Sequence, residues 1–168
     1  ESVRLLVVGC GAEEGRLRER ARAIKERVLF LGGMPREEAD SVIASCQLLV
    51  APYRMPDYDR VSAGGDLSSK ILTYLAADRP VLVSDIPSYA WLPRIGAGEM
   101  VAAGDPRAWA AAIDARLAGW QSAGRPLDGW PWPAPGPGRR FVEEGRTWIR
   151  IAERVAGILG ETAIEPPS

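Results

Sequence analysis

The sequence predicts an α/β fold with an open parallel sheet and helices on both of its faces. Short apolar runs alternate with segments of helical periodicity, and glycine-rich turns follow the first two runs. The apolar runs lack a polar face, which is typical of strands that helices cover on both sides. The chain has 168 residues, 46% of them hydrophobic, which suffices for one core, so we expect one main folding unit.

The first part of the chain alternates between strands and helices. An apolar run over Val3–Val8 ends in Gly9-Cys10-Gly11, and a second run over Val28–Leu31 ends in Gly32-Gly33. The fixed φ of Pro35 suits the first position of the helix that follows. In chain order, the predicted elements are a strand at Val3–Val8, a helix at Glu13–Lys25, a strand at Val28–Leu31, a helix from Pro35 and a strand at Leu48–Ala51.

The middle of the chain continues this alternation. One helix has Asp105 as its N-cap residue and Pro106 at its first position. It continues to Leu117, and the apolar residues on one of its faces are Trp109, Ile113 and Leu117. The other predicted elements are strands at Pro80–Ser84 and Glu99–Ala102 and helices at about Ser69–Ala77 and Ser88–Ile95.

The composition changes near residue 118, and we divide the chain there. Residues 119–139 are rich in proline, glycine and tryptophan without a usable period, which predicts a loop. Its tryptophans are expected to pin it onto the domain of residues 1–118, with a partner or membrane surface as the alternative. A last helix over residues 140–160 is expected to pack back on that domain, and residues 161–168 to form a tail. The apolar side of this helix comprises Phe141, Trp148, Ile151, Val155 and Ile158.

Charge and missing residue types exclude several classes of function. The chain has 21 basic and 22 acidic residues, a net charge of -1, so bulk charge would not hold a nucleic acid. It has no histidine and two cysteines, which argues against a zinc site, a disulfide scaffold and a Ser-His or Cys-His dyad. No apolar run is long enough to span a bilayer and no signal-peptide pattern is present, so we expect a cytoplasmic protein.

One predicted helix start has the chemistry of a phosphate site. Ser68 and Ser69 open this apolar helix, and Lys70 lies in its first turn. Backbone N–H groups, hydroxyl groups and one positive charge together suit a diphosphate. The alternative is an ordinary N-cap by Asp66 or Ser68 beside a solvated lysine, and it stays open. Lys70 is one of two lysines in an arginine-rich chain, which favours a specific role.

The turn at Gly9-Cys10-Gly11 is a weaker candidate. It follows a predicted strand, where a glycine turn lets the backbone approach a phosphate, so Gly11 is a candidate diphosphate contact. Glu14 replaces the third glycine of the G-x-G-x-x-G pattern, and Glu13 and Glu14 would repel a pyrophosphate. A purely structural tight turn is therefore the alternative.

Strung together, these segments resemble a known family, and the order of the pieces carries the likeness. Over roughly Val3 to Leu117 they read LLVVGCGAEEGRLRERA, RVLFLGGMPREEADSVIASCQLLVAPYR, SSKILTYLAADRPVLVSD and GEMVAAGDPRAWAAAI. They look like the donor-binding C-terminal domain of retaining, GT-B-fold glycosyltransferases of the group 1 family, which builds bacterial capsules, O-antigens and exopolysaccharides. The resemblance implies a Rossmann-like domain that binds a nucleotide sugar. It also implies that the domain's first strand and the N-terminal acceptor-binding domain are absent from this chain.

The resemblance implies roles for particular residues. Ser68, Ser69 and Lys70 would face the donor diphosphate and ribose. The turn that lies beside the nucleobase in the family corresponds here to Gly32, Gly33 and Met34.

The chain departs from the family at two carboxylates. When it is aligned on Asp78-Arg79-Pro80, the paired glutamates of the family become Gly65 and Thr73. The carboxylate that would hold the ribose hydroxyls is thereby lost, so either Thr73 and Asp66 replace it or the donor site is degenerate. Asp78 itself stands where the family usually has glycine.

An Asp-x-Asp pattern at Asp57-Tyr58-Asp59 matches the one with which many metal-dependent glycosyltransferases hold manganese. Here it lies in a polar loop between Pro52 and Gly64, not at the end of a strand. We expect a solvated loop, no metal, and no cofactor besides the nucleotide-sugar substrate.

The resemblance thus implies one part of a larger two-domain enzyme that transfers a hexose or aminosugar to a glycan or lipid-linked acceptor. Its catalytic residues are unknown, and this part alone is expected to be inactive. Peripheral membrane association of the full enzyme stays open. One alternative is a non-catalytic binding or scaffolding domain with a degenerate donor site. Another is a different nucleotide-sugar enzyme, such as a hexosamine 2-epimerase, which the lack of histidine disfavours.

Overall fold

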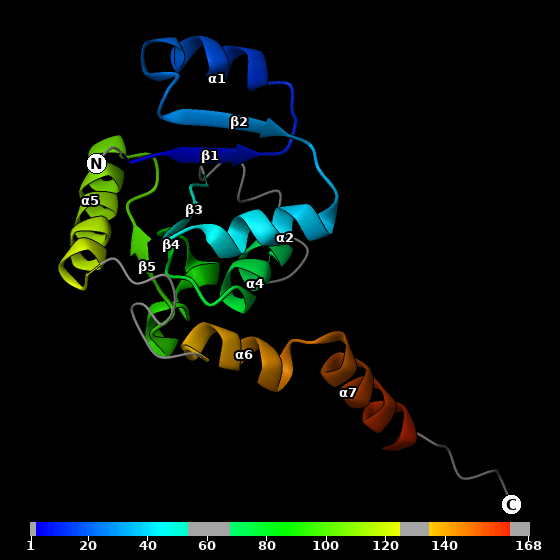
Figure 1. Ribbon diagram of the computed structural model, residues 1–168. Coiled ribbons are helices and arrows are strands. Elements are labelled where there is room, and N and C mark those ends of the chain that lie inside the picture. Colours follow the sequence, from blue (N-terminus) through cyan, green and yellow to red (C-terminus); the bar gives the residue numbers. More distant parts are fainter. Residues whose placement is uncertain (1–2, 54–67, 125–134, 162–168) are drawn as a thin grey trace, which may run out of the picture. The chain divides into compact units, whose positions relative to one another are not determined.

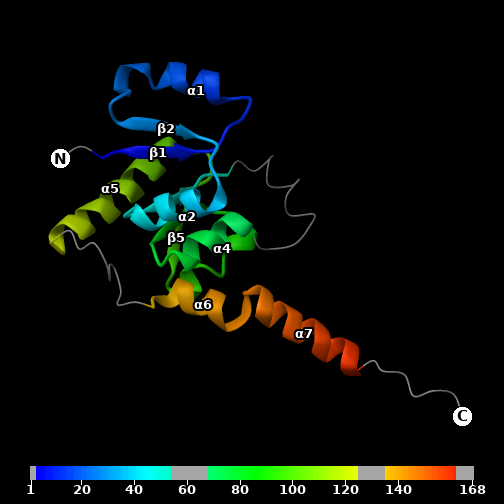
Figure 2. The same cartoon turned by 45° about the vertical axis from the view of Figure 1, so that its right-hand side comes forward.

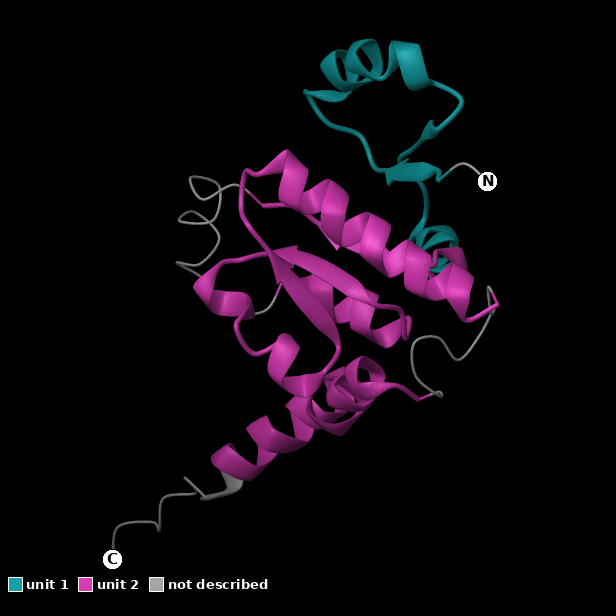
Figure 3. Ribbon diagram, turned by 90° about the vertical axis from the view of Figure 1, so that its left-hand side faces the viewer, with its two compact units in different colours: residues 1–43 teal, residues 44–168 magenta. Residues whose placement is uncertain are grey.

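The computed structural model describes residues 3–53, 68–124 and 135–161. The chain forms two compact units, residues 1–43 and residues 44–168 (Figure 3). The helix α2 (Arg36–Ser45) carries the chain from the first unit into the second. Every strand pair in the described ranges is parallel, and α-helices or 3-10 turns lie between successive strands, so the predicted α/β class is confirmed. The recorded pairs form one two-stranded and one three-stranded sheet.

The first unit holds a pair of strands, a short helix and most of α2 (Figure 1). β1 (Leu5–Val8) runs parallel to β2 (Val28–Gly32). Between them lie α1 (Glu14–Arg20) and a 3-10 turn over Arg22–Ile24. Both strands were predicted to within two residues. The helix predicted over Glu13–Lys25 is shorter than expected, because after α1 the chain tightens into 3-10 geometry.

The second unit is built on three parallel strands with β4 (Val81–Ser84) in the middle. Its neighbours are β3 (Leu49–Ala51) on one edge and β5 (Gly98–Val101) on the other. All four residues of β4 are 0% exposed. Its apolar run lacks a polar face because both of its sides are covered, as the sequence predicted.

Two helices that flank this sheet begin close to where they were predicted. α4 (Ser69–Ala76) buries Ile71 and Leu75. α5 (Pro106–Ser122) begins after Asp105, whose carboxylate accepts hydrogen bonds from the N–H groups of the second and third helical residues at 2.9 and 3.2 Å. This N-cap is therefore confirmed. The helix runs past its predicted end, so residues 119–122 are helical and not part of a loop.

The helix predicted over Ser88–Ile95 is wrong. The structure has two 3-10 turns there, Pro87–Tyr89 and Pro93–Ile95. Pro93 has no N–H group to donate to the preceding turn, so one continuous α-helix is disfavoured. Gly96 then ends the second turn in the left-handed region, with φ at 71°.

The helix predicted over residues 140–160 is two helices, α6 (Pro137–Gly145) and α7 (Trp148–Glu161), which Figure 2 shows following one another. The division falls at Thr147. Its hydroxyl accepts a hydrogen bond from the N–H of Arg150 at 3.3 Å, and its carbonyl accepts one from the N–H of Ile151 at 3.0 Å. A threonine that caps a helix in this way starts a new helix and ends the previous one.

α6 is the part of this pair that packs on α4. Gly138 is buried, and a Cβ added there would lie 2.9 Å from Cδ2 of Leu75, so glycine permits the close approach. The ring of Phe141 stacks on that of Trp91 with centroids 4.8 Å apart. The apolar side chains of α7 are exposed, Trp148 to 85%. None of the described helices is long and apolar enough to cross a membrane.

Asp78 explains one departure from the family pattern. It is a non-glycine residue with φ at 60°. Both oxygens of its carboxylate lie 2.9 Å from the N–H of Gly136, the residue that caps α6. A glycine would adopt this backbone conformation without strain, but it could not anchor α6. Asp78 therefore adopts a strained backbone conformation, and its carboxylate makes a tertiary hydrogen bond that glycine could not make.

Asp78→Ala is expected to lower the free energy of unfolding by about 2 kcal/mol, because it removes a charge-assisted acceptor and keeps the positive φ. Urea unfolding followed by circular dichroism would measure this change. Asp78→Asn is the control, since asparagine tolerates positive φ and keeps one acceptor oxygen. An equal loss in both variants would mean that the hydrogen bond to Gly136 contributes little.

Candidate functional site

A buried serine organises the backbone at the carboxyl end of β3. Tyr53 follows this strand after one proline, and Ser84 ends the neighbouring strand β4. The Oγ of Ser84 accepts a hydrogen bond from the N–H of Tyr53 at 2.7 Å and donates one to its carbonyl at 2.8 Å. Ser84 is 0% exposed, and its hydroxyl serves both as acceptor and as donor in these two hydrogen bonds. We call this pair of bonds the clamp of Tyr53 by Ser84. The position of Tyr53 is thereby set by the interior of the sheet.

The start of α4 is not closed by an ordinary cap. Ser68 occupies the N-cap position, but its side chain makes no capping hydrogen bond. Its Oγ instead lies 3.2 Å from the hydroxyl of Tyr53. The interpretation of Ser68 as a side-chain cap is therefore wrong, and Asp66, the other proposed cap, lies outside the described residues. The N–H of Ile71 donates to the carbonyl of Ser68 at 2.9 Å. The N–H groups of Ser69 and Lys70 precede it in the first turn, where a helix offers no acceptor of its own and where an anion can bind.

Lys70 adds a positive charge to this helix start. Its Nζ lies 5.2 Å from the centroid of the Tyr53 ring, within the range of a cation–π contact. Ser69 and Lys70 are both exposed, and Ser68 is half-buried. Ser68, Ser69 and Lys70 thus lie together at one accessible point, as predicted. Tyr53, which the sequence did not single out, joins them.

Thr73 is engaged within its own helix. Its hydroxyl donates a hydrogen bond to the carbonyl of Ser69 at 3.0 Å. The hydroxyl oxygen of Thr73 can still accept a hydrogen bond, but the hydroxyl proton is already donated to Ser69. Asp66, the other predicted substitute for the missing carboxylate, falls in residues 54–67, outside the described ranges, as does the Asp-x-Asp pattern at Asp57-Tyr58-Asp59.

In the first unit, the two glycine turns lie next to each other at the carboxyl ends of the strands. The N–H of Gly9 donates to the carbonyl of Gly32 at 2.7 Å, and a Cβ added at Gly33 would lie 3.7 Å from Sγ of Cys10. Gly9 and Gly32 have φ at 116° and 72°, so both positions need glycine for conformational reasons. Met34 is half-buried beside them.

Gly11 differs from these glycines. Its φ is not in the left-handed region, and a Cβ added there would meet nothing within 4 Å. A structural tight turn therefore accounts for Gly9 but not for Gly11. The two acidic residues that follow are paired on the surface: Glu13 with Arg16 at 2.5 Å and Glu14 with Arg18 at 2.8 Å. These pairs offset part of the repulsion expected for a pyrophosphate.

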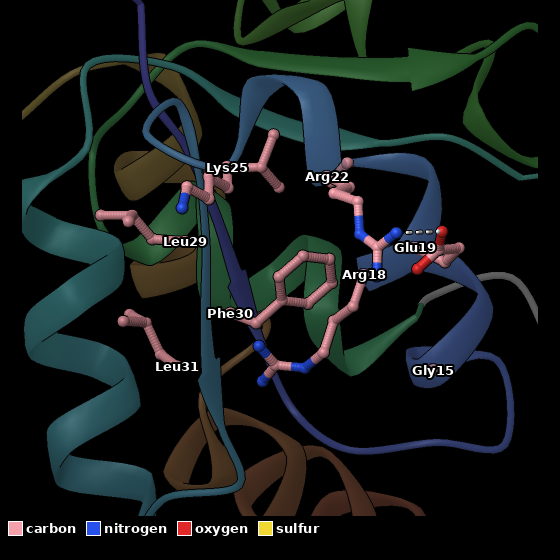
Figure 4. A pocket seen from close by; sticks show the side chains of 10 residues that line it. Gly15, Arg18, Glu19, Arg22, Lys25, Leu29, Phe30 and Leu31 are labelled. Atoms are coloured by element: carbon pink, nitrogen blue, oxygen red, sulfur yellow. Dashed lines mark ion pairs between the residues drawn. The ribbon is translucent and has the colours of Figure 1, made fainter.

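An open hollow of about 640 Å³ lies between α1 and β2 in the first unit (Figure 4). None of the residues of α1 is buried. Arg18 lies 4.6 Å from the centroid of the Phe30 ring, and Arg22 pairs with Glu19 at 3.3 Å. None of the predicted site residues lines it, so this hollow is separate from the predicted donor site.

Two side chains of the second unit, Tyr74 and Cys46, have shifted pKa values. Burial, and secondarily the nearby Tyr53 and Cys46, raise the pKa of Tyr74 above its usual value. Burial also raises the pKa of Cys46. Both groups are therefore neutral at pH 7 and carry no charge toward a ligand. Within the described ranges, no group of three or more acidic or cysteine residues could hold a metal ion.

The two site residues that the sequence did not single out are Tyr53 and Ser84. Their signal was weak: each lies at or just after the end of a predicted strand, and in parallel sheets these ends form the ligand-binding edge. Nothing local shows that the two meet, because 31 positions separate them.

Comparisons with known proteins agree on one family and one fold. The model of the family described as "Glycosyl transferases group 1" matches residues 1–118. Among solved structures, HepE from Anabaena, crystallised in complex with UDP, is similar with a TM-score of 0.66 and 16% identity, over 95% of this chain and 41% of HepE. WaaG, a glycosyltransferase involved in lipopolysaccharide biosynthesis, is similar with a TM-score of 0.62 and 20% identity, over 92% of this chain and 37% of WaaG. No curated protein matches the chain.

HepE and WaaG share the fold of this chain, which confirms the fold class inferred from the sequence. The chain spans about two fifths of the length of the two solved proteins.

Proposed function

The chain belongs to the group 1 glycosyl transferases, and from this membership we propose that it binds the nucleoside diphosphate of a nucleotide-sugar donor at the start of α4. The observation that carries the proposal is the gathering of Ser68, Ser69 and Lys70 at an accessible helix start, where the side chain of the N-cap residue Ser68 makes no capping hydrogen bond. In the proposed role, the chain is the donor-binding part of a larger enzyme that transfers a sugar to a glycan or lipid-linked acceptor.

The chemistry of this helix start suits a leaving diphosphate. Sugar transfer develops negative charge on the diphosphate oxygens as the bond to the sugar breaks. Backbone N–H groups at a helix start, together with a nearby ammonium, can stabilise such charge without reorganising. Lys70 supplies the ammonium, so the proposal includes no metal ion.

The proposal also assigns ligand contacts to the two glycine turns of the first unit. We assign Gly32, Gly33 and Met34 to the nucleobase and Gly11 to the diphosphate. The support for Gly11 is that the backbone does not itself require glycine there. The support for Gly32 and Gly33 is their position at the carboxyl end of a parallel strand.

The second candidate function is a binding or scaffolding domain with a degenerate donor site. The engagement of Thr73 with the carbonyl of Ser69 favours it, because this hydroxyl can accept from a ribose hydroxyl but cannot replace a carboxylate. Calorimetric titration with UDP, GDP and ADP, with and without magnesium, separates the two functions. Saturable binding of one nucleotide that is indifferent to magnesium supports the donor site. No binding of any nucleotide at millimolar concentration would favour scaffolding.

Lys70→Ala is expected to weaken binding of the nucleoside diphosphate by about 1–3 kcal/mol, since it removes a charge-assisted contact. The melting temperature should barely change, because Lys70 is exposed. Calorimetry and thermal unfolding measure the two quantities. Lys25→Ala is the matched control, because it removes the other lysine, which is also exposed. A large loss of stability with unchanged affinity would contradict the role of Lys70.

A further inference from the structure

Tyr53 contacts four residues: Lys70 and Ser68 at the start of α4, Tyr89 in a 3-10 turn, and Ser84 at the end of β4. Its ring contacts the Lys70 ammonium at 5.2 Å and the ring of Tyr89, with centroids 5.7 Å apart. Its hydroxyl lies 3.2 Å from Oγ of Ser68. Its backbone is clamped on both sides of the residue by Ser84. The side chain is half-buried, whereas Lys70 is exposed.

These contacts make Tyr53 a rigid support for a flexible cation. Tyr89 is 3% exposed and Ser84 is 0% exposed, so Tyr53 rests on groups that belong to the core. Lys70 has a four-carbon stem that loses rotamer freedom whenever its ammonium is held in one place. A ring that already restricts the ammonium removes part of this loss before the ligand arrives.

The hydroxyl of Tyr53 has a second effect. A serine at an N-cap position ordinarily turns its Oγ back onto the N–H groups of the first helical turn. Here the Oγ of Ser68 is close to the Tyr53 hydroxyl and makes no capping bond. The N–H groups of the first turn therefore remain unobstructed by the serine side chain.

We propose that Tyr53 is a positioning residue of the donor site: its ring holds the Lys70 ammonium, and its hydroxyl turns Ser68 away from the helix start. This inference rests on the proposed function of that helix start. Tyr53 acts on the diphosphate through Lys70 and Ser68 and does not itself contact the reacting atoms.

Nuclear magnetic resonance of the 168-residue chain tests the placement without a ligand. The chain has two lysines, Lys25 and Lys70, so the lysine ε-methylene region holds two sets of signals, and Lys25→Arg assigns them. The face of an aromatic ring shifts nearby protons upfield. We expect an upfield shift of the Lys70 signal that persists in Tyr53→Phe and disappears in Tyr53→Leu. A Lys70 signal at the position of a solvated lysine, or one that Tyr53→Leu leaves in place, overturns the proposal.

Calorimetry with UDP, GDP and ADP then tests the consequence for binding. For whichever nucleotide binds, Tyr53→Leu should weaken binding about two- to tenfold, which corresponds to the ordering of one long side chain. Tyr53→Phe should fall between Tyr53→Leu and the unaltered chain, because it keeps the ring and loses the hydroxyl. In a chain that already carries Lys70→Ala, Tyr53→Leu should have a clearly smaller effect, since its main target is gone.

A merely structural role gives a different pattern. If Tyr53→Leu weakens binding equally with and without Lys70, Tyr53 does not act through that lysine and the proposal fails. Failure of the proposed function is distinguishable: the unaltered chain would bind none of the three nucleotides, whatever the position of the Lys70 signal. That result would reject the donor role of Tyr53 together with the site.

Discussion

Gly98→Ala is expected to destabilise the unit of residues 44–168 by about 3 kcal/mol, at the upper end of what an added methyl group costs in a packed interior. Gly98 begins β5 and pairs with Val81 of β4. A Cβ at Gly98 would lie 2.3 Å from the carbonyl oxygen of Val81 and 2.8 Å from Cδ2 of Leu92. The first of these neighbours is backbone of a buried central strand, so relief requires β4 and β5 to separate.

Urea unfolding followed by circular dichroism measures this change. Gly157→Ala is the matched control, because Gly157 lies inside α7 and an added Cβ would meet nothing within 4 Å. Alanine is favoured over glycine inside a helix by about 0.8–1.0 kcal/mol, so the same substitution should be neutral or stabilising there. If Gly98→Ala and Gly157→Ala shift the urea midpoint alike, the close approach of β5 to β4 is not what requires glycine at position 98.

Ser84→Val is expected to lower the free energy of unfolding by about 2–4 kcal/mol, because both backbone groups of Tyr53 lose their partner in a site that water does not reach freely. Valine has nearly the shape of serine plus one methyl group, but it can neither accept from the N–H of Tyr53 nor donate to its carbonyl. Because the clamp also places the Tyr53 ring, the Lys70 signal should move toward that of a solvated lysine.

Ser41→Val is the control for the serine substitution. The hydroxyl of Ser41 donates to the carbonyl of Glu37 on an exposed helix surface, where water can replace the bond. Its effect on the free energy of unfolding should stay within about 0.5 kcal/mol. A Ser84→Val chain as stable as Ser41→Val would show that the backbone of Tyr53 finds other partners and that Ser84 is not its clamp.

Several elements of the fold were predictable because their signals are local. Asp105-Pro106 specifies the start of α5 within two residues of sequence, and the apolar run Val81–Ser84 is a strand buried on both sides. Errors arose at helix boundaries that depend on a tertiary contact or on a single residue that interrupts the helix. Thr147 divides the last helix by capping α7, although the apolar periodicity runs across it. The end of α5 at Ser122 was missed because glycine and tryptophan, read as loop residues, continue the helix.

The candidate site was predictable to the same extent. Ser68, Ser69 and Lys70 lie within three consecutive positions, so their placement at one helix start follows from predicting the helix itself. The competing interpretation, a side-chain cap by Ser68, was decided by Tyr53, which takes up the serine hydroxyl from 15 positions away.

Periodicity, helix caps and glycine turns were enough to establish an α/β chain with parallel strands, and the order of its motifs was enough to recognise the family. These signals act between residues a few positions apart, so they can be read from the chain alone. The clamp of Tyr53 by Ser84 joins residues 31 positions apart, and the anchor of α6 by Asp78 joins residues 58 positions apart. Such hydrogen bonds depend on how strands and helices come together, which is why only the folded structure could reveal them.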